Sequence, residues 1–224
     1  MTTTPLGNEN KKIYLITNRT SGDILLNLLK STPFIKEVRI GSPNIIPEMT
    51  ESFLSLFDCI IYDLIDDGFI DTEKSKEIES YLKNDGGSFL VTHDHWDCHK
   101  GPLNLIGLER LDNFDYIHSN KAKVNFYGHE IFNSYNDLTN WKTIDIAKTH
   151  KTYHKIINDK NNNARIIMEL DIKQATDVKH DYLVVNEVGY GRIAYWAAGH
   201  SNTISEEEKK LFINLVAWLT RYKK

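Results

Sequence analysis

The alternation of apolar strands and amphipathic helices in the N-terminal part of the chain constrains its fold more than any other feature. Short apolar runs typical of buried strands occur at 12–17, 37–40, 57–64 and 89–92. Stretches with helical spacing of apolar residues separate them, at 24–29, 51–56 and 73–83. This β-α-β-α-β-α-β order is typical of parallel strands joined by right-handed crossovers. We therefore expect an α/β fold with a mostly parallel sheet.

The C-terminal part predicts further strands and one long helix. The pattern loosens between 101 and 163, where short strands are expected at 121–126 and 141–146. Strands at 165–170 and 182–187 follow, and Gly189-Tyr190-Gly191 predicts a hairpin turn into a strand at 192–197. Ser205 followed by Glu208 predicts a capped helix start, after which apolar residues recur up to Leu219.

Composition excludes several classes of protein. The chain has 224 residues and a net charge of −4 without a long block of one sign, so neither nucleic acid nor a membrane surface is expected as a partner. The two cysteines do not form a disulfide framework. The first residues lack an apolar signal core, and no stretch approaches the about 18 apolar residues of a membrane span. We expect a cytoplasmic protein with a flexible tail at 1–11 and a single domain at 12–224.

A cluster of reactive side chains directly follows the predicted strand 89–92. The residues are His93-Asp94-His95-Trp96-Asp97-Cys98-His99. In open α/β sheets, ligands bind beyond the carboxyl ends of the parallel strands. His93 can therefore act as a general base, a metal ligand or a hydrogen-bond donor, or it can cap the end of its own strand. His95 and His99 have the i, i+4 spacing of metal ligands on a helix, but no Glu follows the first His, and a solvated loop explains them better.

Other polar residues also follow predicted strand ends. His200 comes after the strand at 192–197, His129 follows Gly128 in an irregular segment, and Asn18 and Asp66 follow two N-terminal strands. Loops that converge on one edge of a sheet favour a pocket there. No Gly-rich phosphate-binding motif is present in the sequence.

Four segments resemble, in chain order, the ThuA-like family. They are Tyr62-Asp63-Leu64, the run from Gly86 to His93, Gly128-His129-Glu130-Ile131, and the run from Gly189 to His200. The resemblance implies a flavodoxin-like, three-layer sandwich of the class I glutamine amidotransferase-like superfamily, with an added C-terminal β-hairpin. It also implies a link to sugar utilisation and makes His93, His129 and His200 the site residues.

Two departures from the family pattern matter. The segment at 147–153 lacks the acidic pair that family members carry in an Asp-Glu-x-Tyr element. The turn after strand 89–92 holds His93 where an amidotransferase has its cysteine, so glutamine hydrolysis is not expected.

These observations predict a protein that binds or processes a small polar metabolite, such as a sugar derivative, in a histidine-lined pocket at the carboxyl edge of the sheet. His93, His129 and His200 would be catalytic, with Asn18, Asp66 and His95 binding the substrate. Three converging imidazoles could instead hold a divalent metal such as Zn. The alternatives are a non-catalytic binding or scaffold module, and a thiol enzyme that uses Cys98. A small-molecule ligand is the expected partner, and a homo-oligomer is left open.

Overall fold

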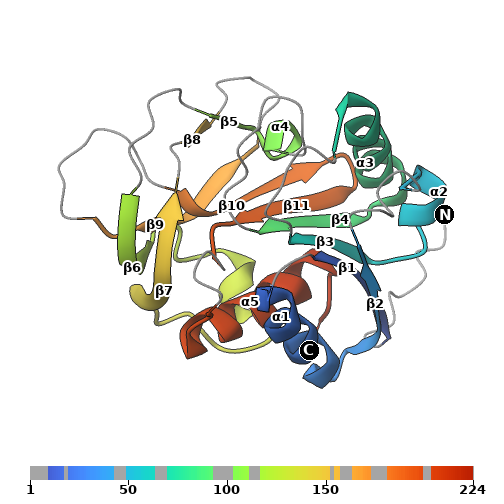
Figure 1. Ribbon diagram of the computed structural model, residues 1–224. Helices are drawn as coiled ribbons and strands as arrows, with labels where there is room; N and C mark the ends of the chain where they lie inside the picture. The colour runs from blue at the N-terminus through green and yellow to red at the C-terminus, as the bar shows by residue number, and fades with distance from the viewer. Residues whose placement is uncertain are drawn as a thin grey trace.

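A nine-stranded sheet forms the centre of the protein (Figure 1). The computed structural model describes residues 10–17, 20–42, 49–63, 70–92, 103–110, 117–151, 154–156, 163–172, 181–198 and 203–223. The strand order is β2-β1-β3-β4-β11-β10-β9-β6-β7. The strands are β1 (Lys11–Thr17), β2 (Ile35–Gly41), β3 (Cys59–Asp63), β4 (Ser88–Thr92), β6 (Ile117–Val124), β7 (Thr143–Lys151), β9 (Arg165–Leu170), β10 (Asp181–Val188) and β11 (Gly191–Trp196). Two short strands, β5 (Leu108–Arg110) and β8 (His154–Ile156), form a separate antiparallel pair.

The sheet is mixed, which corrects the expectation of a mostly parallel one. Strands β2, β1, β3, β4 and β11 run in one direction. Each pairing from β11 through β10, β9 and β6 to β7 is antiparallel. The predicted hairpin is β10–β11, and β11 is inserted between β4 and β10 rather than added at the sheet edge. We call the end where β1, β3, β4 and β11 begin the amino edge, and the end where they stop the carboxyl edge.

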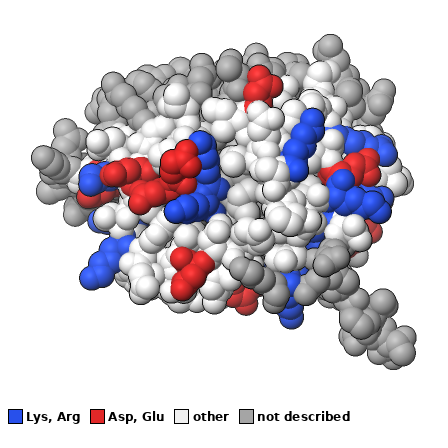
Figure 2. Space-filling model, turned by 90° about the horizontal axis from the view of Figure 1, so that it is seen from below, with Lys and Arg blue, Asp and Glu red and all other residues white. Residues whose placement is uncertain are grey.

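Helices cover both faces of the sheet, as expected for an α/β sandwich. Figure 1 shows α1 (Thr20–Ser31) and α5 (Glu206–Leu219) on one face, and α3 (Thr72–Asp85) and α4 (Leu103–Ile106) on the other. The short α2 (Glu51–Leu54) packs beside α3, and the 3-10 helix η2 (Glu130–Asn133) packs against α5. On the face seen in Figure 2, acidic and basic side chains lie next to one another. A broad area of the same face carries no Lys, Arg, Asp or Glu. Among the described helices, none is long and apolar enough to cross a membrane.

Local signals in the sequence explain where the main helices begin and end. The Asp71 carboxylate accepts a hydrogen bond from the Lys74 N–H at 2.8 Å and caps α3. The same helix ends at Gly86, whose φ of 66° is in the left-handed region that glycine adopts without strain. Helix α5 begins with the predicted capping box, in which Ser205 and Glu208 bond to each other's backbone N–H groups.

The apolar core lies between the central strands and the two helical layers. Every residue of β3 and β4 is buried, because helices cover both faces of these parallel strands. Trp196 of β11 stacks on Phe212 of α5 with ring centroids 5.5 Å apart. The C-terminal end of α5 lies at the amino edge, where the Ser88 hydroxyl donates a hydrogen bond to the Leu219 carbonyl at 2.6 Å.

Candidate functional site

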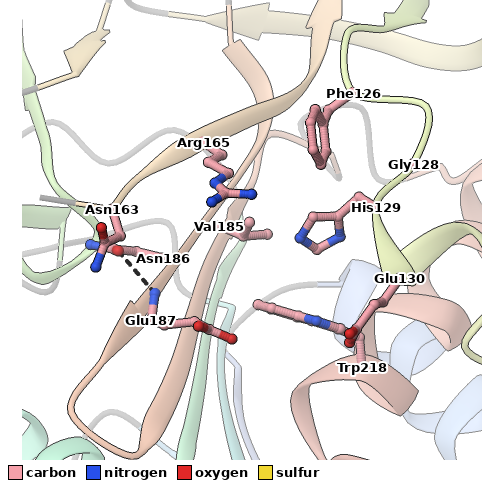
Figure 3. Close-up of a pocket in the computed structure, with 10 residues that line it drawn as sticks. All are labelled: Phe126, Gly128, His129, Glu130, Asn163, Arg165, Val185, Asn186, Glu187 and Trp218. Atoms are coloured by element: carbon pink, nitrogen blue, oxygen red, sulfur yellow. Dashed lines mark hydrogen bonds between the residues drawn. The ribbon is translucent and has the colours of Figure 1, made fainter.

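A pocket of about 540 Å³ opens at the amino edge of the sheet (Figure 3). Four parts of the chain meet there: the connection from β6 to η2, the start of β9, the end of β10 and the end of α5. We call it the amino-edge pocket. Its lining residues are Phe126, Gly128, His129, Glu130, Asn163, Arg165, Val185, Asn186, Glu187 and Trp218.

Strand register fixes the position of this pocket. Glu187 of β10 lies opposite Arg192 of β11, and Arg192 lies opposite Ser88, the first residue of β4. Strand β4 ends four residues later at Thr92, opposite Trp196. At about 3.3 Å per residue, this carboxyl end lies about 13 Å further along the sheet. The amino-edge pocket is therefore at the opposite end of the parallel strands from the predicted one.

His129 forms one wall of the pocket and is held in a single orientation. It caps η2, and its Nδ1 accepts a hydrogen bond from the Ile131 N–H at 3.3 Å. The imidazole packs edge-on against Trp218, with ring centroids 5.3 Å apart. Because Nδ1 is an acceptor here, the neutral ring carries its proton on Nε2.

The surroundings of His129 keep its imidazole neutral. Burial lowers the pKa of His129 to about 4, and the positive charges of Arg165 and Arg192 act in the same direction, against an opposing effect of Glu187. At neutral pH, His129 is therefore a hydrogen-bond donor through Nε2–H rather than a cation.

Arg192 organises the inner side of the pocket. Its guanidinium lies over the Trp218 ring, 4.7 Å from the centroid, and its Nη1 donates a hydrogen bond to the Trp218 carbonyl at 2.6 Å. It also forms ion pairs of 3.6 Å with Glu130 and 3.5 Å with Glu187. The Arg192 side chain is only 17% exposed, so these contacts hold the end of α5 and both acidic side chains to the start of β11.

Arg165 occupies a different wall. Its guanidinium lies over the Phe126 ring at 5.6 Å from the centroid and points into the space that His129 faces (Figure 3). No acidic side chain of the described residues forms an ion pair with Arg165. The pocket thus combines a buried floor of Val185, Asn186 and Trp218 with an exposed rim that carries both signs of charge.

The carboxyl edge has a different arrangement of polar groups. The Asp63 carboxylate accepts hydrogen bonds from the Thr17 hydroxyl at 2.9 Å and from the Thr92 hydroxyl at 2.5 Å. These residues end three adjacent strands, β1, β3 and β4, and Asp63 is 1% exposed. This threonine–aspartate bridge ties the strand ends together, because each hydroxyl reaches the same carboxylate.

Most of the predicted site residues lie outside the described residues. This applies to His93, His95, His200, Asn18 and Asp66, and also to Cys98. His129 is described, and the expectation that it reaches the carboxyl edge is wrong. It follows β6, which runs antiparallel to β4 and β11, so the end of β6 is at the amino edge.

The described residues contain no group of three or more His, Cys, Asp or Glu side chains that could hold a metal ion. Within His129 itself, Nδ1 is already an acceptor, which leaves Nε2 as the ring nitrogen on the pocket side (Figure 3).

The sequence interpretation missed the charged residues of the pocket. Arg165 is the first residue of β9, and Glu187 and Arg192 flank the β10–β11 turn. A single charged residue at such a position is typical of any strand end and does not indicate a site. The sequence signal that could have identified these residues is the hairpin turn. A two-residue hairpin loop places Glu187 opposite Arg192, so both charges share one end of the sheet.

Comparisons with known proteins show which of them share this architecture. No family model matches the chain, and no curated protein matches it by sequence. Solved structures match over almost its whole length. Cytoplasmic Protein STM1381 from Salmonella typhimurium LT2 has a TM-score of 0.67 and 14% identity, covering 95% of this chain and 100% of that one. A protein from Bacteroides uniformis ATCC 8492 described as ThuA-like has a TM-score of 0.65 and 12% identity, covering 96% and 94%.

A third match, Agd3, is described as a novel carbohydrate deacetylase. It has a TM-score of 0.59 and 11% identity, and it covers 96% of this chain but only 33% of its own length. At such identities the similarity shows the fold alone. The chain has a ThuA-like fold, which confirms the predicted resemblance at that level.

Proposed function

We propose that this protein binds a small polyhydroxylated metabolite, of the sugar-derivative class, in the amino-edge pocket. One observation carries the proposal: Arg165 and the Nε2–H of His129 face the same space as the carboxylates of Glu187 and Glu130 (Figure 3). Sugar hydroxyls both donate and accept hydrogen bonds, so they need donors and acceptors around one cavity. The volume of about 540 Å³ lies in the range of small-molecule sites.

The electrostatics of the pocket favour binding over proton transfer. A general base works best when its pKa lies near the working pH. Burial lowers the pKa of His129 to about 4, so its imidazole is a poor base and remains a fixed donor at neutral pH. The proposal therefore assigns His129 to ligand recognition.

The fold relatives support a sugar derivative as the ligand class. Agd3 is described as a carbohydrate deacetylase, and a sequence resemblance to the ThuA-like family links the chain to sugar utilisation. These similarities suggest the class of ligand, whereas the placement of the site rests on the pocket residues.

The proposal is tested by titration calorimetry with a panel of monosaccharides, sugar alcohols and sugar acids. His129→Ala should weaken binding about 10-fold, which corresponds to the loss of one hydrogen bond to the ligand. A Cβ added at Gly128 meets no atom within 4 Å, so a side chain there is tolerated. Gly128→Trp should therefore obstruct the pocket, while Gly128→Ala serves as the matched control. Failure of every member of the panel to bind, or unchanged binding by Gly128→Trp, would contradict the proposal.

We further propose that His93 and His200 belong to a second, separate site at the carboxyl edge. The threonine–aspartate bridge favours it, because Thr92 is fixed by Asp63 directly before His93 in the chain. His93→Ala and His200→Ala should leave binding in the amino-edge pocket unchanged. If both substitutions abolish that binding, the two sites are one and the pocket assignment is wrong.

A further inference from the structure

The charges around the amino-edge pocket are separated in space. In Figure 3, Arg165 projects from β9 on one side, while Glu187 and Glu130 lie beside Trp218 on another. His129 also lines the pocket and is neutral, because burial lowers its pKa to about 4. A ligand in this pocket therefore meets a cation at one end and carboxylates at the other.

The acidic end is already partly neutralised. Arg192 lies 3.6 Å from Glu130 and 3.5 Å from Glu187, and it is held in place by Trp218. The two carboxylates are nevertheless 73% and 64% exposed, so oxygen lone pairs remain for a ligand. Carboxylates that already share a cation suit neutral donors, such as hydroxyl groups, better than a second full positive charge.

The basic end has no such partner among the described residues. Arg165 makes a ring contact with Phe126 but no ion pair with a described acidic side chain. A guanidinium presents several N–H groups in a planar fork that matches a carboxylate in bidentate fashion. The ring contact uses one face of the guanidinium plane and leaves the N–H groups at its edge available.

From this charge layout we infer that the ligand is a sugar acid, a polyhydroxylated compound with one carboxylate. The carboxylate binds the Arg165 guanidinium, and the hydroxyl groups accept from the Nε2–H of His129 and donate to Glu187 and Glu130. This inference rests on the proposed function and adds the ligand's charge and orientation. A phosphorylated sugar and a zwitterionic amino acid are the competing ligands, and the experiment distinguishes both.

Matched probe pairs isolate the contribution of the carboxylate. Gluconate and glucitol differ only in a carboxylate that replaces a CH₂OH group, as do galactonate and galactitol. Glucuronate and galacturonate, with glucose and galactose, form the cyclic pairs. Calorimetry on the full chain should show each bound acid at least about 10-fold tighter than its neutral partner, and the difference should shrink as salt is added.

The variants assign that preference to one residue. Arg165→Gln removes the charge but keeps an amide N–H donor, so it should lower sugar-acid affinity about 10-fold and the affinity for the neutral partner by much less. Arg165→Lys keeps the charge but loses the fork, so it should restore only part of the affinity. Arg39→Gln on β2 is the matched control, because Arg39 is likewise an exposed arginine but pairs with Glu37 at the far edge strand.

The outcomes separate this inference from the function on which it rests. Equal affinities for the acids and their neutral partners, or no loss of affinity in Arg165→Gln, would overturn the inference that the ligand is a sugar acid. If the neutral sugars still bind, the proposed function stands. Tighter binding of glucose 6-phosphate than of any carboxylate, or binding of glycine and serine at the same affinity as gluconate, would also overturn the sugar-acid inference. Failure of all sugars and sugar acids overturns both proposals together.

Discussion

The two edges of the central sheet differ in how they hold their polar groups. At the carboxyl edge, Asp63 is buried and satisfied by two uncharged hydroxyls from neighbouring strands. At the amino edge, one arginine, two glutamates and a neutral histidine line an open pocket, and Arg192 pairs with both glutamates. The carboxyl edge is thus built for internal bonding in its described part, whereas the amino edge presents charge to an open pocket.

Strand direction explains this difference. In a purely parallel sheet, every strand would end at the carboxyl edge and its following loop would lie there. Here β6 and β10 run against β11, so their carboxyl ends reach the amino edge. The mixed sheet therefore has loops that follow strand ends at both edges. The loop with His129 lies at the amino edge, where a purely parallel sheet would have no such loop.

The largest effect is expected at the carboxyl edge. Asp63→Ala removes the carboxylate to which the Thr17 and Thr92 hydroxyls donate, and it should lower the free energy of unfolding by about 3 kcal/mol. Chemical denaturation measures this, and ligand titration of the folded variant should show unchanged binding in the amino-edge pocket. Thr17→Val, which removes only one donor, should cost about 1 kcal/mol. Equal losses in the two variants would show that the carboxylate does not join the strands.

At the amino edge, Arg192→Met tests the group that organises the pocket. The variant keeps an apolar stem against Trp218 but loses the hydrogen bond to its carbonyl and both ion pairs. We expect a loss of about 2 kcal/mol in unfolding free energy, because the ion pairs are partly exposed and contribute little. The same variant should also weaken ligand binding, unlike Asp63→Ala. Unchanged binding would mean that Arg192 only supports the fold.

The smallest expected effect is a pH dependence of the free energy of unfolding that comes from His129 at the amino edge. The pKa of His129 is lowered to about 4 in the folded protein, below its ordinary value of about 6.5. Its stabilising contribution is therefore present above pH 6.5 and is lost as the pH falls towards 4. Between pH 7 and pH 5.5 the loss should be about 1 kcal/mol. His129→Gln should lack this part of the pH dependence in thermal or urea unfolding, and identical profiles for both proteins would rule it out.

Local signals in the sequence predicted much of the fold. The strand at 165–170 has the bounds of β9, the Ser205–Glu208 capping box opens α5, and the helix expected at 73–83 lies within α3. Each is determined by residues that are neighbours in the chain. Turns and helix caps depend on such neighbours, so the local sequence predicts them.

The position of the site could not be predicted in the same way. His129 does follow a strand, but the direction of β6 depends on pairings with β7 and β9, which lie 20 or more residues away in the chain. Arg165 and Glu187 line the same pocket only because β9 pairs with β10. Nothing near these residues in the sequence specifies that pairing, so the charge pattern of the pocket becomes visible only in three dimensions.

The insertion of β11 into the middle of the sheet has a consequence for how the protein is made. Residues 191–196 are synthesised after all the other described strands, yet they join β4 to β10. Until they leave the ribosome, the apolar Phe89-Leu90-Val91 of β4 has a free backbone edge on the side that β11 later occupies. Such an edge invites pairing with other chains, so nascent or truncated forms should depend on chaperones far more than the finished protein.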